Sequence, residues 1–176
     1  MSLDFLTLQK KVEIAARKAF SEVREKHSGD EICGYALYSD ASAMSVSPAA
    51  NSKSHLEDLS EEDPDDADYY RWSTGEWAYE FEGADYFKEA SEMLQNESKS
   101  QANQSDFENF KLQAYEACVR ALETLKEEGF FAKDKEDIVI LFTLSDAEIP
   151  TKEIEWVERL NSQALSDKFK QWIASL

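Results

Sequence analysis

The residues with the most distinctive chemistry lie together between positions 57 and 87. The segment 57–68 (EDLSEEDPDDAD) holds eight acidic residues and no basic one, and residues 69–87 include eight aromatic residues. Carboxylates attract cations and basic proteins, and Trp, Tyr and Arg side chains dominate the binding energy of protein interfaces. We therefore expect this region to bind a partner. The candidate binding residues are Asp63, Asp65, Asp66, Asp68, Tyr70, Arg71, Trp72, Glu76 and Trp77.

The same aromatic residues also fit a purely structural role. Ser73 and Glu76 have the spacing of a capping box, in which the two side chains satisfy backbone N–H groups at a helix start. Aromatic residues at helical spacing pack in the core more often than they bind ligands. In this interpretation Trp72 and Trp77 are buried and Arg71 bridges neighbouring carboxylates.

The acidic run does not have the pattern of a calcium loop. An EF-hand loop requires an oxygen ligand at position 5, glycine at position 6 and glutamate at position 12. Counted from Asp63, these positions are Ala67, Asp68 and Thr74. We expect no dedicated metal site and a solvated acidic loop over residues 57–68.

A hydrolase with a carboxylate-lined cleft is the alternative function. Glycoside hydrolysis needs two carboxylates at a fixed separation, often beside aromatic platforms, and here Trp72 and Trp77 would floor the cleft. A closed pocket with converging acids would favour the enzyme, whereas a broad acidic face would favour the binding module. The candidate carboxylates are Asp40, Glu76, Glu80, Glu82 and Asp146.

Other reaction classes find little support in the sequence. Cys33 and Cys118 could pair with His27 or His55 as nucleophile and base, but both lie in apolar patterns without a nucleophile motif. Burial raises a thiol pKa and weakens the nucleophile, so we expect two inert core thiols. The five glycines form neither of the common nucleotide-phosphate loops, so we expect no cofactor.

Net charge and hydropathy restrict the partner and the compartment. The formal net charge of −18 disfavours nucleic acid and anionic membranes and favours a basic protein. No apolar stretch approaches the ~18 residues of a membrane span, and there is no apolar leader. With two cysteines that are best interpreted as reduced, the sequence indicates a cytoplasmic protein.

Periodic apolar residues predict the helices. Apolar residues recur at three- and four-residue spacing over residues 5–26, after Asp4 as a helix cap. A capping box at Ser105 opens a second long helix that ends at Gly129 and has Leu122 on its apolar face. Further helices are expected at 84–95, 151–160 and 163–175, and a polar linker at 97–105.

Strand patterns complete the expected fold. Residues 32–38 and 43–49 form a predicted hairpin, in which Pro48 places the second strand at an edge or ends it. The continuous apolar run 138–144 indicates a strand covered on both faces and central in the sheet. The length of 176 residues fits one domain, so residues 1–176 are expected to form a single compact α+β domain with a small, mainly antiparallel sheet covered by helices.

Several motifs together resemble a known family. They are GYALYSD (34–40), PAAN (48–51), YYRWSTGEWAYE (69–80), EEGFF (127–131) and the strand that ends in Ser145 and Asp146. In this combination the chain resembles the uncharacterised bacterial proteins of domain of unknown function 4303. The resemblance implies a small bacterial α+β domain without an established activity. It assigns no catalytic residues.

Overall fold

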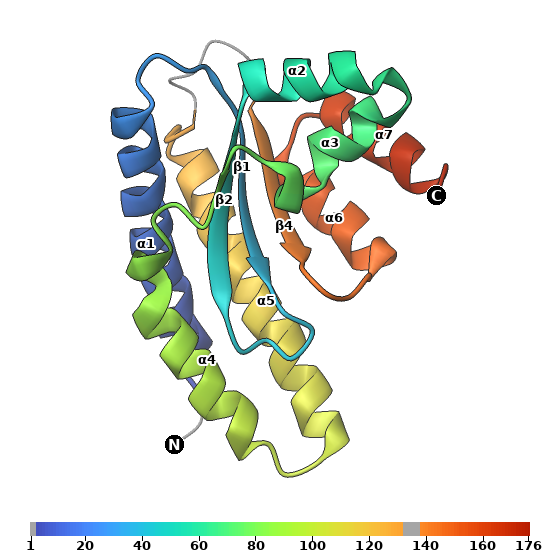
Figure 1. Cartoon of the computed structure of the whole chain (residues 1–176). Helices are drawn as coiled ribbons and strands as arrows, with labels where there is room; N and C mark the ends of the chain where they lie inside the picture. Colours follow the sequence, from blue (N-terminus) through green and yellow to red (C-terminus); the bar gives the residue numbers. More distant parts are fainter. Residues whose placement is uncertain (1–2, 132–137) are drawn as a thin grey trace.

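A four-stranded sheet lies between two layers of helices in the computed structural model, which describes residues 3–131 and 138–176 (Figure 1). Helices α1, α4 and α5 cover one face, and α3, α6 and α7 lie on the other side. This arrangement confirms the expected single α+β domain. The helices are α1 (Phe5–Lys26), α2 (Lys53–Glu62), α3 (Ala67–Trp72), α4 (Lys88–Ser100), α5 (Gln104–Glu127), α6 (Pro150–Leu160) and α7 (Gln163–Ile173), with short 3-10 turns η1 (Pro64–Asp66), η2 (Thr74–Glu76) and η3 (Ala84–Phe87).

The sheet has the order β3-β2-β1-β4, with strands β1 (Ile32–Ser39), β2 (Val46–Ser52), β3 (Tyr79–Glu80) and β4 (Val139–Leu144). The β1–β2 and β2–β3 pairings are antiparallel, as expected for a mainly antiparallel sheet, and the β1–β4 pairing is parallel. Pro48 lies inside β2 and does not end it. The outer neighbour β3 pairs only with Ala49 and Ala50, so β2 is close to an edge along most of its length.

Strand β4 lies at one end of the sheet, so the expectation of a central position was wrong. Its faces are nevertheless both covered: Phe142 packs with the residues of α1 and α5, and Leu141 packs with those of α6 and α7. Helix α6 contributes Trp156 to the first cluster and Val157 to the second, so it flanks the open side of β4. An edge strand covered in this way can be as apolar as a central one.

The core follows the alternation of the strands. Tyr35 and Leu37 of β1 face the larger cluster, which includes Phe20 of α1 and Leu122 of α5, whereas Ala36 faces the smaller cluster. The smaller cluster contains Trp72, Trp77, Val157, Leu165 and Phe169. The helix with Leu122 therefore packs in the core, as its periodicity predicts.

Two segments expected to be irregular are largely helical. The acidic residues 57–62 continue α2, and residues 64–72 form η1 and α3, so the predicted acidic loop is a chain of short helices. An acidic segment can be helical when its carboxylates lie on the solvent-exposed face of each helix, because they remain hydrated there. The predicted linker 97–105 is reduced to residues 101–103, since α4 continues to Ser100 and α5 begins at Gln104 with Asn103 as its cap. The helix start predicted at Ser105 was therefore wrong: the N-cap is Asn103, two residues earlier.

Two glycines permit close packing of the chain. A Cβ at Gly34 would lie 3.0 Å from the ring of Trp77, so only glycine lets this ring pack so closely on β1. Gly83 has a positive φ of 81° and passes against Ala19 of α1, where a Cβ would lie 2.6 Å from the Ala19 Cβ. Both positions fix how the segment after α3 crosses the sheet.

Candidate functional site

The two tryptophans of the predicted binding cluster are buried. Trp72 at the end of α3 is 3% exposed and contacts the ring of Phe169 edge-on, with 5.2 Å between the ring centroids. Trp77 is 4% exposed and packs on Gly34. Their indole N–H groups are also buried, and neither donates a hydrogen bond within the described part of the chain. The expectation that Trp72 or Trp77 binds a partner is therefore not supported, because both rings pack in the smaller core cluster on the sheet.

The capping box expected at Ser73 is also absent. The Ser73 side chain caps no backbone N–H group, and residues 74–76 form a 3-10 turn instead of an α-helix. The Glu76 carboxylate accepts a hydrogen bond of 3.3 Å from the Tyr69 hydroxyl. The 3-10 turn ends at Glu76 and the chain is extended at Trp77, so there is no α-helix at this point for Ser73 and Glu76 to cap.

Arg71 does not bridge carboxylates as expected. Among the residues that the structure describes, no carboxylate lies within ion-pair distance of its guanidinium. Arg71 lines a smaller cavity of about 340 Å³ together with Cys33. Burial raises the pKa of the Cys33 thiol to about 11, which makes it a poor nucleophile.

The acidic segment (residues 57–68) presents its carboxylates to solvent on α2, η1 and the start of α3. All eight acidic side chains are exposed, and none forms an ion pair with a described residue. Tyr69 and Tyr70 follow directly, with Tyr69 exposed and Tyr70 half-buried. Their rings meet edge-on with 5.6 Å between the centroids. The predicted acidic residues Asp63, Asp65, Asp66 and Asp68 thus lie beside aromatic surface, but that surface comes from tyrosine and not from tryptophan.

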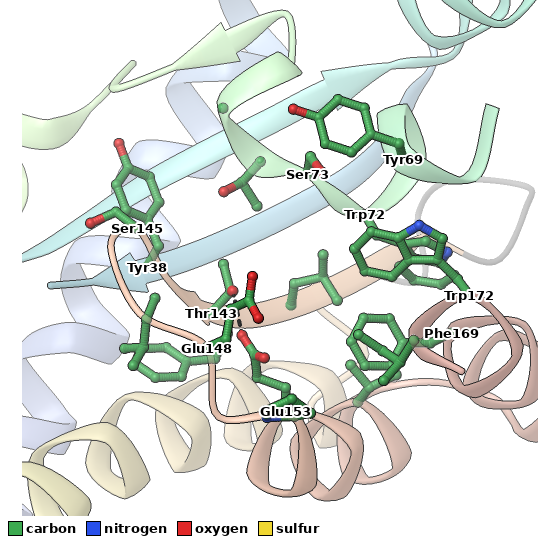
Figure 2. A pocket seen from close by; sticks show the side chains of 18 of the residues that line it. Tyr38, Tyr69, Trp72, Ser73, Thr143, Ser145, Glu148, Glu153, Phe169 and Trp172 are labelled. Atoms are coloured by element: carbon green, nitrogen blue, oxygen red, sulfur yellow. Dashed lines mark hydrogen bonds between the residues drawn. The ribbon is translucent and has the colours of Figure 1, made fainter. Parts of the chain in front are cut away.

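A cavity of about 550 Å³ lies next to this segment, where β1 and β4 end beside α3, α6 and α7; we call it the aromatic cavity. Figure 2 shows Thr143, Glu148 and Glu153 on one side of it and Trp72, Phe169 and Trp172 on the other. Tyr38, Tyr69 and Glu80 also line it. The cavity therefore combines an acidic side with an aromatic side.

Glu153 is the most unusual titratable residue of the aromatic cavity. It is 9% exposed and accepts a hydrogen bond of 2.7 Å from the Thr143 hydroxyl. Burial raises the pKa of this carboxyl group, the Thr143 hydrogen bond opposes the shift, and the charge of Glu148 adds to it. Sequence reasoning missed this residue. The signal was present, because Glu153 precedes Trp156 by three positions and Leu160 by seven, which places a carboxylate on the apolar face of α6.

Of the five carboxylates considered for a hydrolase, only Glu80 lines the aromatic cavity. Its Oε1 accepts a hydrogen bond of 3.2 Å from the Tyr38 hydroxyl. Asp40 and Asp146 instead bind the turn after β1, since Asp146 accepts a hydrogen bond of 2.7 Å from the Ala41 backbone. Glu82 pairs with His27 at 2.8 Å, and Glu76 contacts Tyr69. The sequence therefore indicated the type of residue that lines the cavity, but it did not show which carboxylates lie together in the fold.

The remaining candidate chemistries find no site in the described residues. Cys118 is buried in the core, and its burial raises the thiol pKa to about 12. His27 stacks on Tyr79, and the ring of His55 contacts the backbone oxygen of Glu76. Within residues 3–131 and 138–176, no three His, Cys, Asp or Glu residues are grouped as metal ligands. Each helix of this part of the chain is too short or too polar to span a lipid bilayer.

Comparison with known proteins gives one match. A family model described as a domain of unknown function (DUF4303) matches residues 12–162. No curated protein and no solved structure matches the chain. The matched range includes the sheet, the acidic segment and Glu153, and it stops before the α7 residues Phe169 and Trp172 that line the aromatic cavity.

Proposed function

This chain belongs to the DUF4303 family, whose description assigns no activity, and we propose from its own surface that it is a non-enzymatic module that binds a basic protein. The acidic segment carries the proposal. Its eight exposed carboxylates have no cationic partner among the described residues, so their charge is available to another molecule. Long-range attraction of this kind steers association of oppositely charged proteins.

The anchor of such an interface would be tyrosine. Tyr69 and Tyr70 lie immediately beside the acidic residues, and Tyr is one of the residue types that dominate binding energy in interfaces. The exposed Tyr69 ring offers apolar area next to charge that steers the partner. An inhibitor or immunity-type protein, which covers the basic surface of its target, is the kind of binding module that we propose.

The proposed setting is a bacterial cytoplasm. The two cysteines are unpaired, which is in keeping with a reducing compartment. A strongly acidic protein also repels nucleic acid and anionic lipid, so a basic protein is the partner that its net charge of −18 favours.

A hydrolase is the less well supported alternative. Trp77 lies outside the aromatic cavity, and the Trp72 ring packs on Phe169, so the expected two-tryptophan floor is not formed. Turnover of a 4-nitrophenyl glycoside that is lost in Glu153→Gln would reverse this ranking.

The test compares two variants with the same change in charge. The first replaces Asp63, Asp65, Asp66 and Asp68 by asparagine. The control replaces four exposed acids elsewhere, as Glu25→Gln, Asp85→Asn, Glu92→Gln and Glu127→Gln. Proteins captured at low salt by the unaltered chain are identified by mass spectrometry, and the association rate of each purified candidate is measured at several salt concentrations.

The acidic-segment variant should lose association rate and salt dependence, while the control retains both. A Tyr69→Ala variant should mainly raise the dissociation rate, because packed side chains hold a complex that charge has assembled. Equal losses in the two charge variants would show that net charge alone matters. The proposal fails if the unaltered chain captures no basic protein.

A further inference from the structure

We propose that the aromatic cavity is a binding site for a cationic organic group of the alkylammonium or guanidinium type. This goes beyond the proposed protein interaction, because it concerns the cavity and not the acidic segment. The volume of about 550 Å³ lies within the range of roughly 300–1,000 Å³ that is usual for small-ligand pockets.

The charge of the lining selects the sign of the ligand. Three carboxylates, Glu80, Glu148 and Glu153, line the cavity, and no Lys, Arg or His from the described chain does. None of the three carboxylates has a cation within ion-pair distance among those residues. An anionic ligand would meet uncompensated repulsion, whereas a cation would supply the missing countercharge.

The aromatic side selects a cation with a soft, weakly hydrated surface. Tyr69, Trp72 and Trp172 all line the cavity, and the Trp172 ring lies 5.7 Å from that of Phe169. Cations bind the faces of Trp and Tyr rings through the ring quadrupole. In the described chain, Lys and Arg side chains lie over Phe20, Tyr86, Phe107 and Phe130 but over none of the cavity rings. The cavity rings are therefore unoccupied by the protein's own cations.

Glu153 gives the strongest geometric reason for a cationic occupant. The Glu153 carboxylate accepts a hydrogen bond from Thr143, and backbone groups of Leu144 and Ile149 also favour its ionised form, but its burial outweighs them. A buried carboxylate without a cationic partner is costly to keep ionised. The other charged groups of the cavity do not reduce this cost: the charge of Glu148 raises the pKa of Glu153 further, and Glu80 accepts a hydrogen bond from Tyr38. A guanidinium or ammonium group beside Glu153 would stabilise the ionised form.

This arrangement predicts a proton coupling. Because burial raises the pKa of Glu153 and a bound cation would lower it again, the ligand should bind more tightly as the pH rises through that pKa. Binding below it should release a proton from the protein. A site that used only the aromatic rings would show neither effect.

The proposal concerns an organic cation and not a bare metal ion: among the described residues, no three His, Cys, Asp or Glu side chains are grouped so that they could hold a metal. It leaves two sources for the cationic group, a free small molecule or an Arg or Lys side chain of another protein, which share the same chemistry.

The experiment is calorimetric titration of the full chain with butylguanidinium and, as a neutral analogue of the same shape, butylurea. Butylguanidinium should bind at least about tenfold more tightly, since cation–π and charge contacts together exceed one decade in affinity. Glu153→Gln should weaken this preference and lose the pH dependence. The exposed Glu158, which pairs with Lys170 outside the cavity, supplies the control Glu158→Gln, which should retain both.

A second arm identifies the source. A short peptide with one arginine is compared with the same peptide with citrulline, and both with free butylguanidinium. Tighter binding of the arginine peptide indicates a protein side chain, and tighter binding of the free cation indicates a small molecule.

Variants must be shown to fold, so the circular dichroism and urea midpoint of Glu153→Gln are measured first. If that variant is unfolded, Trp172→Ala on the rim of the cavity replaces it and should weaken butylguanidinium binding by about tenfold. Equal affinity for butylguanidinium and butylurea, or no binding of either, overturns the proposal. Either result leaves the interaction of the acidic segment with a basic protein unaffected, so the two proposals fail separately.

Discussion

The side-chain amide of Asn161 makes two hydrogen bonds with the backbone of Ile140, as a neighbouring strand would. Its Oδ1 accepts from the Ile140 N–H at 2.9 Å, and its Nδ2 donates to the Ile140 carbonyl at 2.7 Å. The same Nδ2 lies 3.1 Å from the carbonyl oxygen of Val157, which ties the sheet to α6. One side chain thus satisfies buried backbone groups at the outer edge of β4.

Removal of this amide should destabilise the protein strongly. Asn161→Ala leaves two backbone groups of Ile140 without a partner, at roughly 1–3 kcal/mol for each. Urea unfolding measures the loss. The control is Asn103→Ala, which removes an exposed helix cap and should cost about 1 kcal/mol. A loss no larger than that of the control would contradict the proposed role.

Two leucines of α5 test the core. Leu122 is 0% exposed, so Leu122→Ala should cost roughly 2–5 kcal/mol through lost burial and a residual cavity. Leu112 on the same helix is 47% exposed, and Leu112→Ala should change stability by less than about 0.5 kcal/mol. Similar denaturant midpoints for the two variants would mean that α5 is not packed as described.

Gly83→Ala should destabilise the chain because both space and backbone conformation oppose a side chain there. The new Cβ would overlap Ala19 of α1, and the positive φ adds strain. We expect a loss of roughly 1–3 kcal/mol in thermal or urea unfolding. Gly75→Ala has open space and no positive φ, so it should be nearly neutral. Equal effects of the two substitutions would argue against the close contact with α1.

Glu153 should make a distinct contribution to the pH dependence of stability. Its pKa is higher in the folded protein than in the unfolded chain, so protonation of Glu153 stabilises the fold. This stabilisation is fully present below the unfolded pKa and is lost as the pH rises through the folded pKa. Glu153→Gln keeps an acceptor for Thr143 without the charge. It should be more stable than the unaltered chain at pH 7 and should lose this advantage below about pH 4, near the ordinary pKa of glutamate. Unfolding free energies measured from pH 4 to pH 8 check this, and a constant difference across that range would contradict it.

Salt should stabilise the fold through the acidic segment. Its eight carboxylates repel one another, and ~0.15 M salt reduces the reach of that repulsion to about 8 Å. The variant with asparagine at Asp63, Asp65, Asp66 and Asp68 should be more stable at low salt and should respond less to added salt. Melting temperatures in 0.02 and 0.5 M NaCl provide the test. Salt-independent melting of the unaltered chain would mean that these charges do not limit its stability.

The elements that carry their own signals were predictable from the sequence. The first helix was predicted at residues 5–26 and lies at Phe5–Lys26, because Asp4 caps it and its apolar period is regular. The apolar run 138–144 contains β4, but its place in the sheet was wrong, because Asn161 and α6 cover it in place of another strand. The local sequence of β4 does not show that a distant side chain and helix stand where another strand would pair.

The candidate site was predicted in composition and not in geometry. The acidic segment could be predicted to be exposed from its charge, because burial of eight carboxylates so close in sequence would cost too much free energy. Trp72 and Trp77 are buried because they pack in the smaller core cluster against residues that are distant in sequence. The local sequence around each tryptophan does not show such long-range packing. Glu153 was overlooked because one carboxylate among 37 acidic residues stands out only when its helix face is known.

The parallel pairing of β1 with β4 also has a kinetic consequence. The β1–β2 hairpin can form from neighbouring residues, whereas β4 pairs with β1 across the whole stretch of sequence from β2 to α5. Closing so long a loop costs entropy before its contacts repay it, and topologies of this kind fold slowly. Helix α6 and Asn161 depend on β4, so they and the aromatic cavity should form in the last step of folding. The refolding rate of this protein should therefore follow the docking of β4 and be insensitive to substitutions in the acidic segment.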